Sequence, residues 1–255
     1  MCAIALYCAQ FYKILIVIFE ESYTILSLMC DASDKLSLWG VARLFQEVAE
    51  HHTSLTHIGF EDLMKEKKAW VLSRMYYRIT RLPAVGETVT LKTWSRGTNG
   101  LFAFRDYLMV DACGNAIISA TSDWVLIDFE KRHACRLYDI MEHYEHHDIC
   151  ATERNHFDKL KLPEVNSNNL ISAIAVRESM IDHTQHVNNA EYLRLIDDSI
   201  NKADEHLETL EIVFSNETHR HEQMQIFRIQ TDEFCFFQIS NPREVAVKAK
   251  ATFKN

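Results

Sequence analysis

The feature that most constrains the fold of this 255-residue chain is an order of predicted elements that occurs twice. In each copy, a segment rich in strand-forming residues precedes one amphipathic helix, and four strand-like segments follow that helix. In the first copy the strand-like segments are Ser22–Asp31, Trp70–Thr80, Glu87–Arg96, Leu101–Val110 and Asn115–Asp128. In the second copy they are Asn169–Met180, Leu207–Glu217, Gln223–Gln230, Glu233–Ser240 and Glu244–Phe253.

Each copy contains one predicted helix. Ser37 is a suitable N-cap for the first helix, whose buried face is predicted to carry Leu38, Val41, Phe45, Val48 and His52. The second helix is predicted to begin at Asn188 and to bury Leu193, Ile196, Ile200, Ala203 and Leu207. Tight turns join most of the strands, which argues against a parallel sheet, because parallel strands need long crossover connections. The pattern therefore predicts an α+β protein in which each antiparallel sheet packs against its own helix.

The composition between and before the two copies sets the predicted domain boundaries. Residues 141–165 are charged and rich in histidine, and we predict a linker there between an N-terminal unit, 22–140, and a C-terminal unit, 166–255. Residues 1–21 begin with an apolar stretch that is barely long enough for a membrane anchor and lacks the features of a secretory signal. We expect an extension outside the fold, with a membrane anchor as the open alternative.

Charge and cysteine content narrow the classes of function. The net charge of −9 argues against nucleic-acid binding, and the small cluster Lys65, Lys67 and Lys68 is typical of a solvated face. The seven scattered cysteines form no CxxC motif, which favours free thiols in a reducing, cytoplasmic compartment. The histidine-rich runs lack zinc-ligand spacing, and no glycine-rich phosphate loop is present. We therefore expect no metal, no nucleotide cofactor and no membrane partner.

The stretch Asp182–Ile200 concentrates short polar side chains at the start of the second helix. Asn188 suits the N-cap, and Glu191 follows it at the spacing of a capping box. Free backbone N–H groups at such a helix start can also hold an anion, including an oxyanion that forms during a reaction. Asp182, Thr184 and His186 alternate, so an extended approach would point all three to one side, where a carboxylate can fix a histidine's tautomer.

Several segments, in matching order, resemble the acyl-acyl-carrier-protein (acyl-ACP) thioesterases: RLFQEVAEHH, AWVLSRM, GETVTLKTWSRG, LFAFRDY and ATSDWVLIDFEKR. DHTQHVNNAEY is similar to the active-site motif of that family. The resemblance covers the chain from about Ser22 onward. It implies a double hotdog, in which each of two tandem hotdog folds is a long helix wrapped by a curved antiparallel sheet.

The resemblance also implies an activity and a partner. The family hydrolyses the thioester of fatty acyl-ACP, which releases free fatty acid and ends chain elongation, and it uses no cofactor. The implied partner is an acyl carrier protein that carries a fatty acyl chain, and a homodimer is a further open alternative.

The same resemblance implies roles for individual residues. Catalytic roles are implied for Asp182, Thr184, His186 and Glu217. Substrate contacts are implied for Val187, Asn188 and Asn189. The glutamate would activate water, because Thr218 stands where some relatives carry a cysteine once interpreted as a nucleophile.

Alignment of the two copies by hand predicts a division of labour. Lys35 falls on His186 and Leu82 falls on Glu217, so the first copy lacks the implied catalytic groups. The family implies that this copy holds the acyl chain in an apolar tunnel between helix and sheet.

One departure from the family pattern keeps two alternative functions open. Thr184 stands where the family usually has asparagine, and a hydroxyl offers fewer donors and less reach than a carboxamide. The alternatives are a hotdog-class acyl-CoA thioesterase and a non-catalytic acyl-binding protein.

Overall fold

One continuous sheet of eleven strands crosses the computed structural model, within the residues that it describes: 18–142, 144–202 and 205–254. The strand order is β1-β3-β4-β5-β2-β8-β11-β10-β9-β7, with β6 paired to β5, and all pairs are antiparallel. The N-terminal half supplies β1 (Phe19–Thr24), β2 (Lys68–Ile79), β3 (Thr88–Thr98), β4 (Ala103–Val110), β5 (Ala116–Asp128) and β6 (His133–Ala134). The C-terminal half supplies β7 (Leu170–Ala175), β8 (His206–Phe214), β9 (Gln223–Gln230), β10 (Cys235–Ser240) and β11 (Val245–Lys254).

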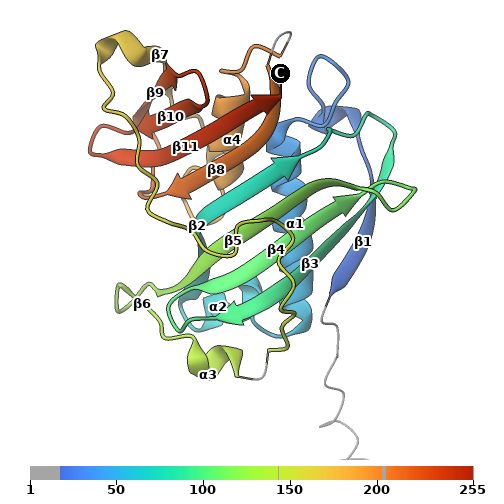
Figure 1. Ribbon diagram of the computed structural model, residues 1–255. Coiled ribbons are helices and arrows are strands. Elements are labelled where there is room, and N and C mark those ends of the chain that lie inside the picture. The colour runs from blue at the N-terminus through green and yellow to red at the C-terminus, as the bar shows by residue number, and fades with distance from the viewer. Residues whose placement is uncertain (1–17, 143, 203–204, 255) are drawn as a thin grey trace, which may run out of the picture.

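Two helices occupy the inner face of this sheet, one for each half (Figure 1). They are α1 (Leu38–Leu55) and α4 (Asn189–Asp197), and they pack against each other. The two halves join where β2 pairs with β8, from Arg74 opposite Val213 to Arg78 opposite Thr209. The predicted double arrangement is therefore confirmed, and the two sheets merge into one.

Helix α1 forms as the sequence predicts. The Ser37 hydroxyl accepts a hydrogen bond from the Gly40 N–H (3.1 Å), which satisfies one of the free amides of the first turn. All five residues predicted on its buried face are at most 2% exposed. Phe45 stacks on Tyr107 of β4 with ring centroids 4.9 Å apart, so the helix is packed directly onto the sheet.

Helix α4 is shorter than predicted. It ends at Asp197, and Leu207 lies in β8, while Ala203 lies outside the described residues. Two acidic residues, Asp197 and Asp198, stand at the helix C-terminus, where the helix dipole disfavours negative charge. Beyond the helix, the Glu205 N–H donates to the Asn201 carbonyl (2.8 Å).

Short helical segments replace parts of two predicted strands. β1 begins at Phe19, so the predicted boundary at residue 22 is wrong, and residues 1–17 of the predicted extension lie outside the described residues. β1 ends at Thr24, and Ser27–Met29 form a 3-10 helix. Likewise β7 ends at Ala175, and Glu178–Met180 form a 3-10 helix. A third 3-10 helix spans Ser167–Asn169. Two further short helices were not predicted: α2 (Phe60–Lys65) and α3 (Tyr138–Met141).

The predicted linker lies across the outer face of the sheet, on the side away from α1 (Figure 1). Trp94 of β3 donates through its indole N–H to the Ile149 carbonyl (2.8 Å). Tyr76 of β2 donates through its hydroxyl to Glu153 (2.5 Å). These contacts hold the segment against the strands, so the segment covers one face of the N-terminal half.

None of the helices in the described residues has both the length and the apolarity that a membrane crossing requires. The lysine cluster noted in the sequence is largely paired, since Lys65 lies 2.8 Å from Asp62 and Lys68 lies 2.6 Å from Glu66. The cluster therefore carries little net positive charge.

Candidate active site

Two turns with the same hydrogen bonds precede the two inner helices. In the first, the Asp31 N–H donates to the Lys35 carbonyl (2.8 Å), and in the second the Asp182 N–H donates to the His186 carbonyl (3.0 Å). The aspartate carboxylate of each turn accepts the backbone N–H two residues later, at 2.9 and 2.8 Å. Lys35 and His186 therefore occupy equivalent positions, as the hand alignment predicts.

A second pair of equivalent contacts fixes the other half of the alignment. The Leu36 N–H donates to the Pro83 carbonyl (2.9 Å), and the Val187 N–H donates to the Thr218 carbonyl (2.9 Å). Because Pro83 matches Thr218, the residue before each also matches, and Leu82 stands where Glu217 stands in the other half. The prediction that the N-terminal half lacks these two functional groups is confirmed.

The predicted extended approach to α4 is wrong. Residues 182–185 form a turn, in which Gln185 takes a left-handed conformation with φ of 69°. The Asp182 carboxylate accepts the Thr184 N–H (2.8 Å), the Thr184 hydroxyl (2.5 Å) and the Asn188 side-chain amide (3.1 Å). Asp182 and Thr184 therefore hold the shape of the turn, and the carboxylate orients Asn188 instead of the His186 ring. Alternating polar residues predicted a strand, but Asx-type side-chain bonds favoured the turn.

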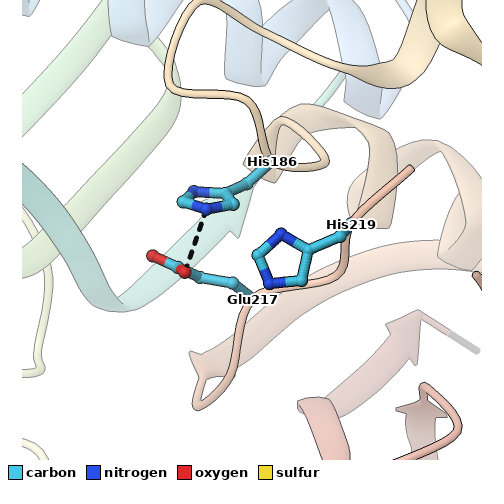
Figure 2. A group of neighbouring side chains, drawn as sticks. All are labelled: His186, Glu217 and His219. Atoms are coloured by element: carbon cyan, nitrogen blue, oxygen red, sulfur yellow. Dashed lines mark ion pairs between the residues drawn. The ribbon is translucent and has the colours of Figure 1, made fainter.

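The group that contacts the His186 ring is Glu217. Its Oε2 atom lies 3.1 Å from His186 Nε2, although the two residues are 31 positions apart in the sequence (Figure 2). Burial lowers the pKa of His186 below its ordinary value, His219 lowers it further, and the carboxylates of Glu217 and Asp182 act in the opposite direction. The lowered pKa favours the neutral imidazole at pH 7, and its Nε2 lies within ion-pair distance of the carboxylate.

His219 is a third member of this cluster that the sequence analysis missed. Its ring lies edge-on to the His186 ring, with centroids 4.8 Å apart and planes at 68°, and it flanks the Glu217 carboxylate (Figure 2). The signal available in the sequence was one Glu-x-His spacing after a strand, which is too common to indicate a site. Thr218, between them, is fully buried, so its hydroxyl is withheld from any molecule in the cavity.

The start of α4 combines a cap with a free amide. The Asn188 side chain accepts the Ala190 N–H (2.9 Å), which confirms the cap, but Glu191 does not complete the predicted capping box. Glu191 instead accepts the Trp39 indole N–H (2.8 Å) and pairs with Arg194. Burial against α1 thus directed this side chain away from the helix start.

The backbone N–H of Asn189 has no acceptor among the described residues. The equivalent N–H in the N-terminal half, that of Leu38, faces the Asp197 carboxylate at 3.3 Å. In the N-terminal half a carboxylate therefore occupies the anion position, whereas in the C-terminal half the same position is open. This difference favours anion binding at the start of α4.

A cavity of about 1450 Å³ connects this cluster with the N-terminal half. Its walls include His186, Glu217 and His219 from the C-terminal half. From the N-terminal half they include apolar side chains of α1, the sheet and α3, among them Ala49, Leu72, Ala103, Trp124 and Met141. Arg105, which donates to the Tyr144 hydroxyl (3.0 Å), adds a polar group. Pockets for ordinary small ligands measure about 300–1,000 Å³, so this cavity has room for a longer molecule.

Comparison with known proteins gives matches over both halves. A family model for the acyl-ACP thioesterase N-terminal domain matches residues 17–144, and one for the acyl-ACP thioesterase C-terminal domain matches residues 164–255. A chloroplastic acyl-[acyl-carrier-protein] hydrolase of Cuphea viscosissima is 29% identical over 190 residues, which cover 69% of this chain and 46% of that protein. This chain spans about half the length of the relatives that it matches in sequence.

Solved structures share the fold. An acyl-ACP thioesterase from Bacteroides thetaiotaomicron aligns with a TM-score of 0.79 at 21% identity, over 93% of this chain and 98% of that one. The 12:0-ACP thioesterase from Umbellularia californica aligns with a TM-score of 0.79 at 20% identity, over 93% and 97% of the two chains. The double hotdog architecture is therefore shared with these proteins.

Proposed function

We propose, because this chain belongs to the acyl-ACP thioesterase family, that it hydrolyses the thioester of fatty acyl-ACP and releases free fatty acid. The observation that carries the proposal is the pair His186 and Glu217, 3.1 Å apart, on the wall of a cavity that extends into the N-terminal half. The cavity offers room for an acyl chain, and the pair offers a base for water.

In the proposed reaction, Glu217 accepts a proton from water as the water oxygen attacks the thioester carbonyl carbon. His186, neutral at pH 7, places its Nε2 3.1 Å from the Glu217 carboxylate and helps to position it. The carbonyl oxygen gains negative charge, which the free Asn189 N–H at the start of α4 stabilises. When the intermediate collapses, the C–S bond breaks and the proton held by Glu217 passes to the thiolate of the carrier's prosthetic group.

The remaining residues implied by the family take supporting roles in this scheme. Asp182 and Thr184 maintain the turn that presents His186, and Asp182 also orients the cap residue Asn188. Val187 is 5% exposed, and its N–H bond to Thr218 ties the His186 segment to the Glu217 segment. We therefore propose positioning roles for these residues.

Hydrolysis assays with three outcomes test the substrate class. Purified protein, in excess over the substrate, is mixed with acyl-ACP or with acyl-CoA of the same acyl chain length. The release of free fatty acid is then measured over time. The proposal expects faster release from acyl-ACP. Faster release from acyl-CoA would assign the other substrate, and tight binding of acyl-ACP without release would assign a binding protein.

A further inference from the structure

The cluster His186, Glu217 and His219 has the composition of a transition-metal site. Imidazole nitrogen and carboxylate oxygen are common ligands of Zn²⁺, and two histidines with one carboxylate are a recurring set. One ligand atom from each of the three residues lies within 4.8 Å of the other two. Nothing in the sequence spacing reveals this set, because His186 comes from the turn before α4 and the other two residues follow β8.

The distances require small side-chain movements. Ligand atoms that share one tetrahedral Zn²⁺ lie about 3.3 Å apart, since zinc–nitrogen and zinc–oxygen bonds are about 2.0–2.1 Å long. His186 Nε2 and Glu217 Oε2 already lie 3.1 Å apart. The remaining pairs must close from at most 4.8 Å. The Glu217 side chain is 53% exposed, so it is free to rotate toward the two rings.

The backbone that carries the three ligands is fixed. The Val187 N–H bond to the Thr218 carbonyl (2.9 Å) joins the two segments at the residues beside His186, Glu217 and His219. The Asn241 side chain donates to the Glu217 carbonyl (3.0 Å), and the His219 N–H donates to Glu222 (2.8 Å). Metal binding thus needs side-chain rotation alone, and little backbone conformational entropy is lost.

The charge around the cluster also suits a cation. The Glu217 carboxylate is itself a ligand, and Asp182 acts electrostatically on the His186 ring. The nearby guanidinium of Arg243 pairs with Glu222 at 3.0 Å, which offsets its positive charge. Three protein ligands leave a fourth zinc position open, and all three residues line the large cavity, so water can fill that position.

We infer that His186, Glu217 and His219 form a binding site for a divalent transition metal, with Zn²⁺ as the best fit, and that metal binding inhibits hydrolysis. The inhibitory part rests on the proposed function. Zn²⁺ on Glu217 Oε2 occupies the lone pair that accepts the proton from water, and Zn²⁺ on His186 Nε2 replaces the direct His186–Glu217 contact that positions the carboxylate. Binding itself does not depend on the function.

Titration of the full chain with Zn²⁺, followed by calorimetry, tests the binding. We expect one site per chain, and absorption from Co²⁺ at the same site with the intensity of a four-coordinate centre. His219→Gln keeps a polar side chain of similar size and removes one ligand. Loss of a group that merely orients a ligand costs about 10–100-fold in metal affinity, so loss of a ligand should cost at least about 100-fold. His221→Asn is the matched control, because it removes an imidazole from the same loop at a residue outside the cluster. Residue 221 has a φ of 65°, which asparagine tolerates.

Each outcome decides the inference. Saturable 1:1 binding that weakens in His219→Gln and persists in His221→Asn, with unchanged melting temperatures, supports the site. Equal affinity in all three proteins, or no binding by the wild type, overturns it. For inhibition, the ratio of acyl-ACP hydrolysis with and without Zn²⁺ should fall in the wild type and stay near one in His219→Gln at the same metal concentration. Acceleration by Zn²⁺ would overturn the inhibitory role, and a wild type that binds Zn²⁺ but hydrolyses no thioester would leave the site standing while the proposed function fails.

Discussion

Lys202→Met should destabilise the fold while leaving the candidate active site intact. The Lys202 ammonium lies 2.6 Å from Asp31 of the N-terminal half and 2.9 Å from Asp197 at the end of α4. Asp197 is 7% exposed and also accepts the Leu38 N–H, so it lies in the N-terminal counterpart of the active site. Removal of the lysine leaves this buried carboxylate with one backbone donor.

The size of the effect follows from burial. Breaking a buried ion pair by removing one partner costs about 3–5 kcal/mol, but the Lys202 side chain is 38% exposed, and solvent screening reduces the expected loss to about 2–3 kcal/mol. Burial raises the pKa of Asp197 even with Lys202 present, and loss of the lysine raises that pKa further. A carboxyl whose folded pKa is raised has no effect on stability below its unfolded pKa, destabilises the fold as the pH rises between the two pKa values, and has its full effect above the folded pKa. The difference between variant and wild type should therefore be larger at pH 8 than at pH 5.

Urea unfolding followed by circular dichroism at pH 8 and pH 5 measures this difference. Lys202→Arg, which keeps the charge, should recover most of the stability, and Lys65→Met, which removes an exposed pair with Asp62, should leave the midpoint unchanged. Per folded molecule, acyl-ACP hydrolysis by Lys202→Met should match the wild type. An unchanged midpoint at pH 8, or a loss that grows toward pH 5, would refute this reasoning.

Substitutions at three further positions probe the fold, the turn and the cavity. Burial raises the pKa of Asp123 to about 6. Asp123→Asn should therefore gain about 2 kcal/mol of unfolding free energy at pH 8 and none below pH 4, as measured by urea unfolding. Equal gains at both pH values would contradict this expectation. In Thr184→Asn, the asparagine side chain should keep the hydrogen bond to Asp182, whereas Thr184→Val loses it. Thr184→Asn should therefore lower the turnover of acyl-ACP less than Thr184→Val does. Equal turnover in both variants would show that the bond is dispensable. Ala103→Leu should narrow the cavity and reduce turnover of long acyl chains about tenfold relative to short ones, and an unchanged product profile by mass spectrometry would place the chain elsewhere.

Much of the fold was predictable because alternating or apolar periodicity sets both strand positions and the buried face of α1. The errors lie where local side-chain bonds override that periodicity. At residues 182–185 the carboxylate of Asp182 binds its own turn, and at the end of α4 two consecutive aspartates stop a helix whose apolar pattern continued to Leu207. In both places one or two short side chains set the local structure, and the periodicity of apolar residues does not reveal their effect.

The candidate site was predictable in part for a related reason. Glu217 could be assigned through the family resemblance, and the alignment of the two copies gave its counterpart Leu82, which the hydrogen bonds of the two turns confirm. His219 was missed because its significance arises from its distance to His186 across a loop, and that distance is absent from the sequence. The pairing of Asp197 with the Leu38 N–H was likewise invisible, since it joins the two halves.

In the proposed reaction, one half binds the acyl chain while Glu217 of the other half activates water. Both parts are measured in a single-turnover experiment with wild type or Glu217→Gln in excess over acyl-ACP, in which free fatty acid is followed by rapid quench and acyl-ACP affinity is measured in parallel. The glutamine is close in size but does not accept a proton from water, so we expect a loss of about 10²–10⁴-fold in the rate of release with unchanged affinity. If Glu217→Gln released fatty acid at more than half the wild-type rate, Glu217 would not be the base.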